Sequence, residues 1–181
     1  MRPVICALFG WIASTCTVFA TTQVTLVLQF DAAHSEQSVS EMKSELQSLM
    51  RDAGVELNRR RTEELSSSDS FPSVVVVTFH GSCEMKPFAP PLPSEPVALA
   101  STHLSNGQII PFADVECDQI RSSLRAAHAE SGSTGDLLFG RAMGRVLAHE
   151  LHHIIDRTRA HTPHGITRKS LSPRDLIADR T

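Results

Sequence analysis

Two histidines and a glutamate occur at the spacing H-E-x-x-H in the run His149-Glu150-Leu151-His152-His153. Residues four apart on a helix lie one turn above each other, so His149 and His153 can both reach one metal ion. Histidine nitrogens bind zinc at about 2.0 to 2.1 Å. Glu150, one position round the helix, would then face a metal-bound water and could act as its base. The run therefore indicates zinc-dependent hydrolysis.

The residues around this run predict the helix that such a site needs. Apolar side chains recur at three- and four-residue spacings over residues 137–156, which indicates a largely buried amphipathic helix. An ordinary pair of surface histidines is the alternative, but imidazoles in so apolar a helix need polar partners, and a metal ion supplies them. Candidate N-caps are Ser133, Thr134 and Asp136. The apolar positions are Leu137, Phe139, Met143, Val146, Leu147, Leu151, Ile154 and Ile155.

The first twenty residues have the pattern of an export signal. Arg2 gives a positive start, residues 4–20 are mostly apolar, and small residues end at Ala20, where a signal peptidase would cut. A membrane anchor is the alternative, but Ser14 helps to break an apolar run that is already shorter than the roughly 20 residues that span a bilayer. A lipid anchor on Cys16 is disfavoured by the large residue before it. We expect cleavage after Ala20 and a secreted or periplasmic protein without stable membrane insertion.

Cleavage would leave residues 21–181, the length of one domain that buries its own core. The whole chain has 20 acidic and 17 basic residues and a net charge of −3, so nucleic-acid binding is not expected. We interpret the basic residues near the C-terminus as a solvated face.

Two cysteines, Cys83 and Cys117, remain after the predicted cleavage. An even number in an exported chain predicts one disulfide. Closing a loop of about 35 residues constrains the unfolded chain by roughly 3 to 4 kcal/mol. The alternative is that one cysteine is a thiolate ligand of zinc, which would leave the other unpaired in an oxidising compartment.

The rest of the chain predicts an α+β domain. The valine run at 74–77 is typical of a strand buried on both faces, Asn106-Gly107 of a hairpin turn, and the five prolines within 86–96 of an exposed connection. The order of elements predicts a twisted mixed sheet with the H-E-x-x-H helix packed beneath it. Strands are expected at 24–30, 55–57, 74–77, 97–102 and 109–115, and helices from Ser38 to Gly54, at 118–130, at 137–156 and after Ser172.

A catalytic zinc normally has three protein ligands and one open position, so the histidine pair needs a partner. His161 lies beyond the expected helix end, where a loop can fold back toward the metal, and His164 is equally placed. Asp156 could share the helical face only from a distant turn. The full set of candidates is Asp156, His161, His164, Asp175 and Asp179.

Residues 148–167, AHELHHIIDRTRAHTPHGIT, resemble a family of small secreted bacterial zincin-like metalloproteases with the pattern HExGHxxLGxxxHSxxGIM. That pattern is similar to a lengthened metzincin motif. The resemblance implies a zincin fold, a Zn²⁺ site formed by His149, His153 and His161, and Glu150 as the catalytic carboxylate. It extends over the first strand, the hairpin and both cysteine regions, and so covers most of the mature chain.

Three positions depart from the family pattern. His152 and Arg157 stand where the family has glycine, and Thr167 follows Gly165 and Ile166 where the family has methionine. The change at Arg157 predicts a different turn after the helix. The change at Thr167 removes packing beneath the metal but no ligand.

These observations predict a secreted zinc metallopeptidase that hydrolyses peptide bonds by Glu150-assisted attack of a zinc-bound water. The chain has no tyrosine, so zinc or a backbone amide near the hairpin must stabilise the oxyanion. The hairpin at 97–115 is the candidate edge for a peptide or protein substrate, or else only part of the sheet. His80 and His103 are interpreted as ordinary strand-end residues. The alternative function is a catalytically inactive zincin-like module that binds peptides or is stabilised by zinc; the presence of Glu150 favours catalysis.

Overall fold

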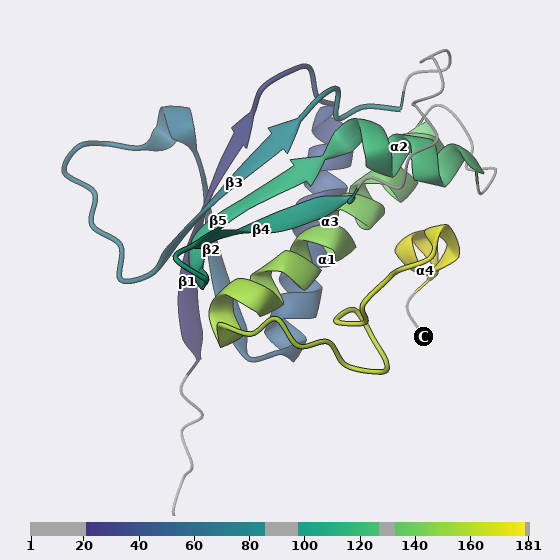
Figure 1. Cartoon of the computed structure of the whole chain (residues 1–181). Helices are drawn as coiled ribbons and strands as arrows, with labels where there is room; N and C mark the ends of the chain where they lie inside the picture. The colour runs from purple at the N-terminus through teal and green to yellow at the C-terminus, as the bar shows by residue number, and fades with distance from the viewer. Residues whose placement is uncertain (1–20, 86–97, 127–132, 180–181) are drawn as a thin grey trace, which may run out of the picture.

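The structure, a computed structural model, describes residues 21–85, 98–126 and 133–179. The predicted signal segment 1–20 and the proline-rich segment 86–96 lie outside these residues. A five-stranded sheet forms one layer and two long helices form the other, as Figure 1 shows. Among the described residues, no helix combines the length and the apolar character that a membrane crossing requires.

The sheet is mixed, which confirms the predicted α+β class. Its strand order is β2-β1-β3-β5-β4; the first four strands in this order are parallel, and β4 pairs antiparallel with β5 at one edge. The strands are β1 (Thr22–Phe30), β2 (Val55–Arg61), β3 (Val74–His80), β4 (Ala100–Ser105) and β5 (Gln108–Glu116). The helices are α1 (Glu36–Asp52), the 3-10 turn η1 (Thr62–Glu64), α2 (Cys117–Ala126), α3 (Ser133–Asp156) and α4 (Pro173–Ile177).

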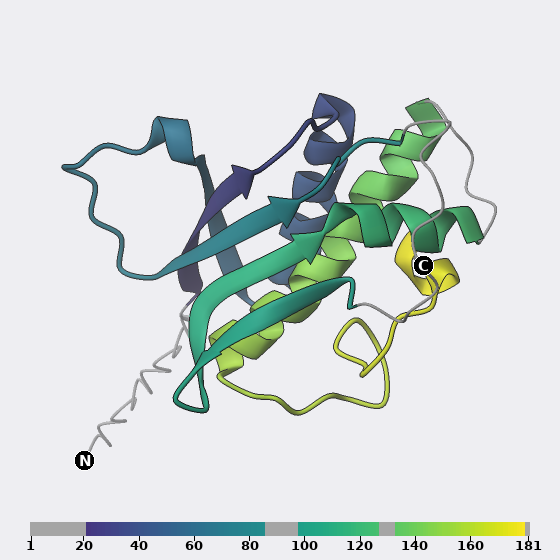
Figure 2. The same cartoon turned by 45° about the horizontal axis from the view of Figure 1, so that its top comes forward.

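Helices α1 and α3 lie side by side on the same face of the sheet, as Figures 1 and 2 show. Two glycines of α3 permit this close approach. A Cβ atom at Gly140 would lie 2.4 Å from the backbone oxygen of Ser38, and one at Gly144 would lie 2.9 Å from that of Met42. Because α3 carries the H-E-x-x-H run, this close packing against α1 helps to set the position of His149 and His153 relative to the sheet.

The burial of β3 differs from the prediction. Val75, Val77 and Phe79 are buried, whereas Val74 and Val76 are only partly buried. The prediction of a strand buried on both faces is therefore wrong. Both long helices cover the same face of the sheet, so successive residues alternate between the core and the less covered face.

The predicted helix starts are also wrong. Helix α1 begins at Glu36 with Ser35 as its N-cap, two residues before the predicted start at Ser38. Helix α3 begins at Ser133, so the three candidate N-caps lie within it. The Asp136 carboxylate instead accepts hydrogen bonds from the hydroxyls of Ser35 and Ser38 and from the backbone N–H of Met85. These bonds join the start of α1 to the start of α3.

The other elements largely follow the pattern of the sequence. The hairpin turn is confirmed, because Asn106 and Gly107 both have positive φ values, 51° and 76°. Helix α2 ends at Ala126. The last four residues of the predicted helix 118–130, residues 127–130, lie outside the described residues. Leu137, which was expected on the buried stripe of α3, is 41% exposed.

Cys83 and Cys117 form the predicted disulfide, and both are buried. The bond joins the segment after β3 to the first residue of α2, and the two cysteines are 34 positions apart in the sequence. Neither sulfur is therefore a free thiolate that could bind a metal. These two cysteines therefore stabilise the fold, and the histidine imidazoles remain candidate metal ligands.

Removing this bond is expected to destabilise the fold. Replacement of both cysteines by alanine should lower the free energy of unfolding by about 3 to 4 kcal/mol, because the unfolded chain regains the freedom of the closed loop. Urea unfolding of the native and variant proteins measures the difference, and the native protein in reducing agent serves as the control. Equal unfolding midpoints in the three samples would show that the disulfide does not contribute to the free energy of unfolding.

Candidate metal centre

Three imidazoles meet at the C-terminal end of α3. His149 and His153 come from the helix, and His161 comes from the segment that follows it. One nitrogen from each of the three rings lies within 4.8 Å of the other two. The ring centroids of His149 and His161 are 5.2 Å apart, and those of His153 and His161 are 4.9 Å apart. Such a group can hold one metal ion.

Backbone carbonyl groups orient the two helix histidines. His149 Nδ1 lies 2.9 Å from the carbonyl oxygen of Ile166, and His153 Nδ1 lies 2.7 Å from that of Thr158. A carbonyl oxygen can only accept a hydrogen bond, so each Nδ1 carries the proton and donates it. In a neutral ring with its proton on Nδ1, Nε2 keeps its lone pair, which is the form that a metal ligand needs.

The two Nε2 atoms face each other at 3.1 Å. With both Nδ1 atoms protonated, two neutral rings would bring lone pair against lone pair with no proton to share. A cation between the rings removes this conflict. Two nitrogens bound to one tetrahedral zinc at about 2.05 Å lie roughly 3.3 Å from each other, which is close to the observed separation. The donor set therefore fits a zinc ion.

The segment after α3 brings the third imidazole into place. The helix ends at Asp156, and Arg157 follows with a positive φ of 49°, the left-handed conformation in which helices commonly end. The chain thus turns here on an arginine in a conformation that glycine adopts more readily. Figures 1 and 2 show the segment running back beside α3 on the side of β4.

The loop 162–167 then brings the backbone carbonyl group of Ile166 back to α3. The N–H of Thr162 donates to the carbonyl oxygen of Thr167 at 3.1 Å, and Gly165 has a φ of 76°. This loop carries Ile166, whose carbonyl accepts from His149. Thr167, at the methionine position of the family pattern, closes the loop through its backbone.

The pKa of His161 is lowered, first by reduced contact with solvent and then by the neighbouring His149 and His153. A lowered pKa favours the neutral ring at neutral pH, because protonation would place a positive charge beside the other two imidazoles. Neutral imidazole is the form that binds a metal ion.

The other third-ligand candidates lie elsewhere in the described structure. His164 is exposed, and its carbonyl accepts a hydrogen bond from the Thr162 hydroxyl at 2.6 Å. The three aspartates have side-chain partners away from the cluster: His152 for Asp156, Ser172 and Arg168 for Asp175, and Arg141 for Asp179.

Glu150 is 8% exposed and lies against the edge strand. The hydroxyl of Thr102 on β4 donates to its Oε2 atom at 2.7 Å. Thr102 pairs with the buried Ala113 of β5, so its side chain faces α3. Sequence reasoning missed Thr102, because its partner is 48 positions away and no motif joins the two residues.

His80 and His103 belong to a different hydrogen-bond network, which is centred on Asp114 of β5. Asp114 lies between the buried residues Ala113 and Val115, so its side chain is on the opposite face of the sheet from the core. His103 Nε2 donates to Asp114 at 2.7 Å, and His80 bonds to Asp31 at 2.9 Å and lies 3.4 Å from Asp114. The hydrogen bond with Asp31 raises the pKa of His80. His103 sits in mid-strand where the β4 register shifts, so its interpretation as a strand-end residue is wrong.

A small hollow of about 290 Å³ opens beside the histidine cluster. Its walls come from α3, from the start of β4 and from the segment before α4. Its volume is that of a site for one side chain rather than for a large ligand. The lining residues are Ala98, Leu99, Ala100, Val146, His149, Glu150, Arg168, Lys169, Ser170 and Leu171.

Comparison with known proteins adds no relative. No family model matches the chain, and neither a curated protein nor a solved structure matches it. The function is therefore inferred from the geometry of the site.

Proposed function

We propose that the chain is an exported zinc metallopeptidase with a zincin-like active site. His149, His153 and His161 would hold the ion, and Glu150 would be the general base. The observation that carries this proposal is the facing pair of Nε2 atoms at 3.1 Å, with both Nδ1 atoms bonded to carbonyl groups. Such a pair can accommodate a cation, and the third imidazole completes a three-nitrogen set to which a zinc ion could add one more ligand.

A zinc ion at this position would supply a Lewis acid and lower the pKa of a water molecule toward about 7. Glu150 is placed to accept a proton from that water and to pass it to the leaving nitrogen. Thr102 bonds to Oε2, so Oε1 is the oxygen assigned to proton transfer. Low exposure of the carboxylate keeps bulk water away from this step.

The edge strand β4 is the proposed seat of the substrate. It is the last strand in the sheet order, so one side of its backbone has no neighbouring strand among the described elements. An extended peptide can bond to such an edge as an added strand. Thr102 on the same strand reaches Glu150, so a peptide on β4 would pass next to the base. The small hollow would receive one of its side chains.

Thr102 is expected to position Glu150. Replacing Thr102 by valine keeps the shape but removes a hydrogen bond to a charged group, and kcat should fall about tenfold with KM nearly unchanged. Steady-state kinetics on one cleaved peptide checks this. Thr102→Ser should restore most of the rate, because it restores the hydroxyl. A valine variant with native kcat would remove Thr102 from the mechanism.

Metal analysis together with peptide cleavage tests the proposed function. The protein purified from its exported form should contain one zinc ion per chain and should cleave members of a peptide library. Treatment with 1,10-phenanthroline should abolish cleavage, and added zinc should restore it. A protein that binds no zinc under these conditions would contradict the proposal at its base.

A second candidate function is an inactive zincin-like module that binds peptides. The observation in its favour is the absence of tyrosine from the whole chain, because a phenol is one of the groups that can stabilise an oxyanion. The buried Glu150 with its own hydrogen-bond donor favours catalysis over binding alone.

A further inference from the structure

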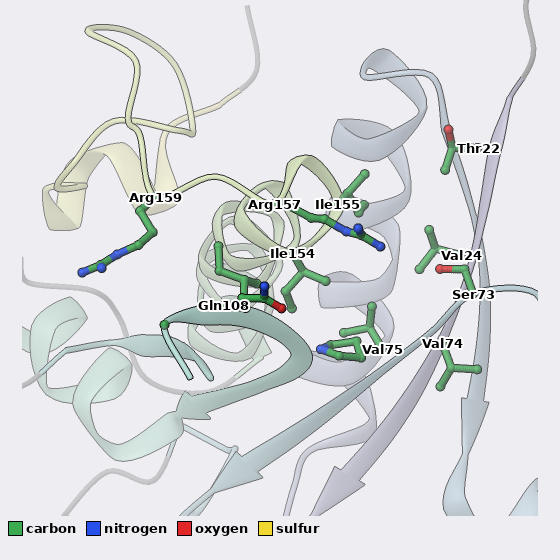
Figure 3. Close-up of a pocket in the computed structure, with 13 residues that line it drawn as sticks. Thr22, Val24, Ser73, Val74, Val75, Gln108, Ile154, Ile155, Arg157 and Arg159 are labelled. Carbon is green, nitrogen blue, oxygen red and sulfur yellow. The ribbon is translucent and has the colours of Figure 1, made fainter. Parts of the chain in front are cut away.

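A larger hollow lies at the other side of the hairpin and has no part in the proposed reaction. Its volume is about 710 Å³, within the usual range for small-molecule sites. Figure 3 shows it between the hairpin tip and the starts of β1 and β3, with the last turn of α3 as its floor. We call it the hairpin groove. Its lining residues are Thr22, Val24, Ser73, Val74, Val75, Gly107, Gln108, Ile109, Pro111, Ile154, Ile155, Arg157 and Arg159.

The groove exists because two neighbouring strands separate. The pairing of β3 with β5 begins at Val76 and Phe112, although both strands start earlier. Pro111, the residue just before this point, has no N–H and cannot donate a backbone hydrogen bond. The two strand starts diverge from there, and the space between them opens onto α3.

The inner wall of the groove is apolar. Val24, Val75 and Ile154 are buried side chains at its base, and Ile109 and Ile155 are partly buried beside them. Such a wall favours a ligand with an apolar body, because the ligand would remove from water its own apolar surface and the exposed parts of Ile109 and Ile155.

The charge at the groove is entirely positive. Among the residues that the structure describes, Arg157 and Arg159 are the only charged ones that line the groove, and neither forms an ion pair with another of these residues. Figure 3 shows Arg157 reaching across toward β1 and Arg159 at the opposite rim. Guanidinium groups recognise carboxylates and related anions through paired N–H donors.

We propose that the hairpin groove binds an organic anion with a compact apolar body. Its acidic group would meet Arg157 at the mouth, and its apolar part would lie on Val75 and Ile154. None of the three clustered histidines lines the groove, nor does Glu150, so the proposal does not depend on zinc or on peptide cleavage. The shared ligand chemistry is a carboxylate on an apolar group, as in a fatty acid or the C-terminus of a peptide.

Two dyes of nearly equal shape test the proposal on the full mature chain. 8-Anilinonaphthalene-1-sulfonate carries an anionic group, and N-phenyl-1-naphthylamine is the same body without it. Fluorescence titration should give one anion-dye site per chain, with at least about tenfold tighter binding than the neutral dye. Equal affinities would overturn the proposal.

Variants locate the site. Arg157→Gln should weaken the anionic dye about tenfold and leave the neutral dye unchanged, because only the charge pairing is lost. Arg174→Gln, an exposed arginine on α4, is the matched control and should change neither dye. Ser73→Phe should weaken both dyes by filling the groove. Native affinity for the anionic dye in Arg157→Gln would overturn the assignment.

Competition identifies the source of the ligand. Decanoate represents a fatty acid, and N-acetyl-leucyl-phenylalanine represents a peptide C-terminus. Displacement of the anionic dye by either compound supports the groove as a carboxylate site and names its source. Failure of both compounds at millimolar concentration would contradict it. The result should be the same in the presence of EDTA, which separates this test from the metal site.

Discussion

Glu150→Gln is expected to lower kcat for peptide cleavage by about 10²- to 10⁴-fold while zinc affinity stays close to native. The glutamine side chain keeps the size of the carboxylate and can still accept from Thr102, but it cannot take a proton. Glu150 is absent from the nitrogen cluster, so its replacement removes no ligand. The measurement is steady-state cleavage of one library peptide, with zinc content determined on the same sample.

Glu63→Gln is the matched control for this result, because Glu63 is an exposed residue of η1 on another part of the fold. The control should have native kcat. Two other outcomes discriminate between the candidate functions. Zinc retained with no cleavage by either the native protein or the variant supports the inactive binding module. Equal cleavage by both would assign the base to another residue.

His161→Ala is expected to weaken zinc binding by more than about 100-fold, because loss of a ligand should exceed the 10- to 100-fold effect of removing an outer hydrogen-bond partner. His164→Ala should leave the affinity unchanged. The two histidines lie three residues apart, yet only His161 places a ring nitrogen within reach of the other two. Competition with a chromophoric chelator measures both affinities.

The same two variants also distinguish an effect on zinc binding from an effect on the stability of the fold. Both side chains are exposed, so neither replacement should alter the free energy of unfolding of the metal-free protein. Thermal unfolding in EDTA provides this control. If His164→Ala alone releases the ion, the ligand set is wrong even though the site binds zinc.

Local patterns allowed much of the fold to be predicted from the sequence. The histidine helix, the Asn-Gly turn and the disulfide were each predicted from residues that act through spacing or backbone conformation. The class of the sheet followed from the order of the elements. Such features depend on short stretches of chain, where propensity and periodicity dominate.

The errors arose where distant parts of the chain determine local structure. Asp136 was a reasonable N-cap by residue type, but it bonds to serines of α1 about a hundred positions away. The run of valines at 74–77 was consistent with full burial, and only the placement of both helices on one face reveals its exposed side. Thr102 reaches Glu150 through the strand order, which the sequence does not display.

The carbonyl groups that hold His149 and His153 both belong to the chain segment that also carries His161. Any cation that gathers the three rings must therefore draw this tail onto the helix, and any disturbance of the tail must loosen the grip on the cation. Binding of an ion at the proposed site and ordering of the tail would therefore be thermodynamically linked, since each would favour the other. If the proposed zinc site is correct, the stretch that follows α3 would be part of that site, because it supplies one ring and orients the other two.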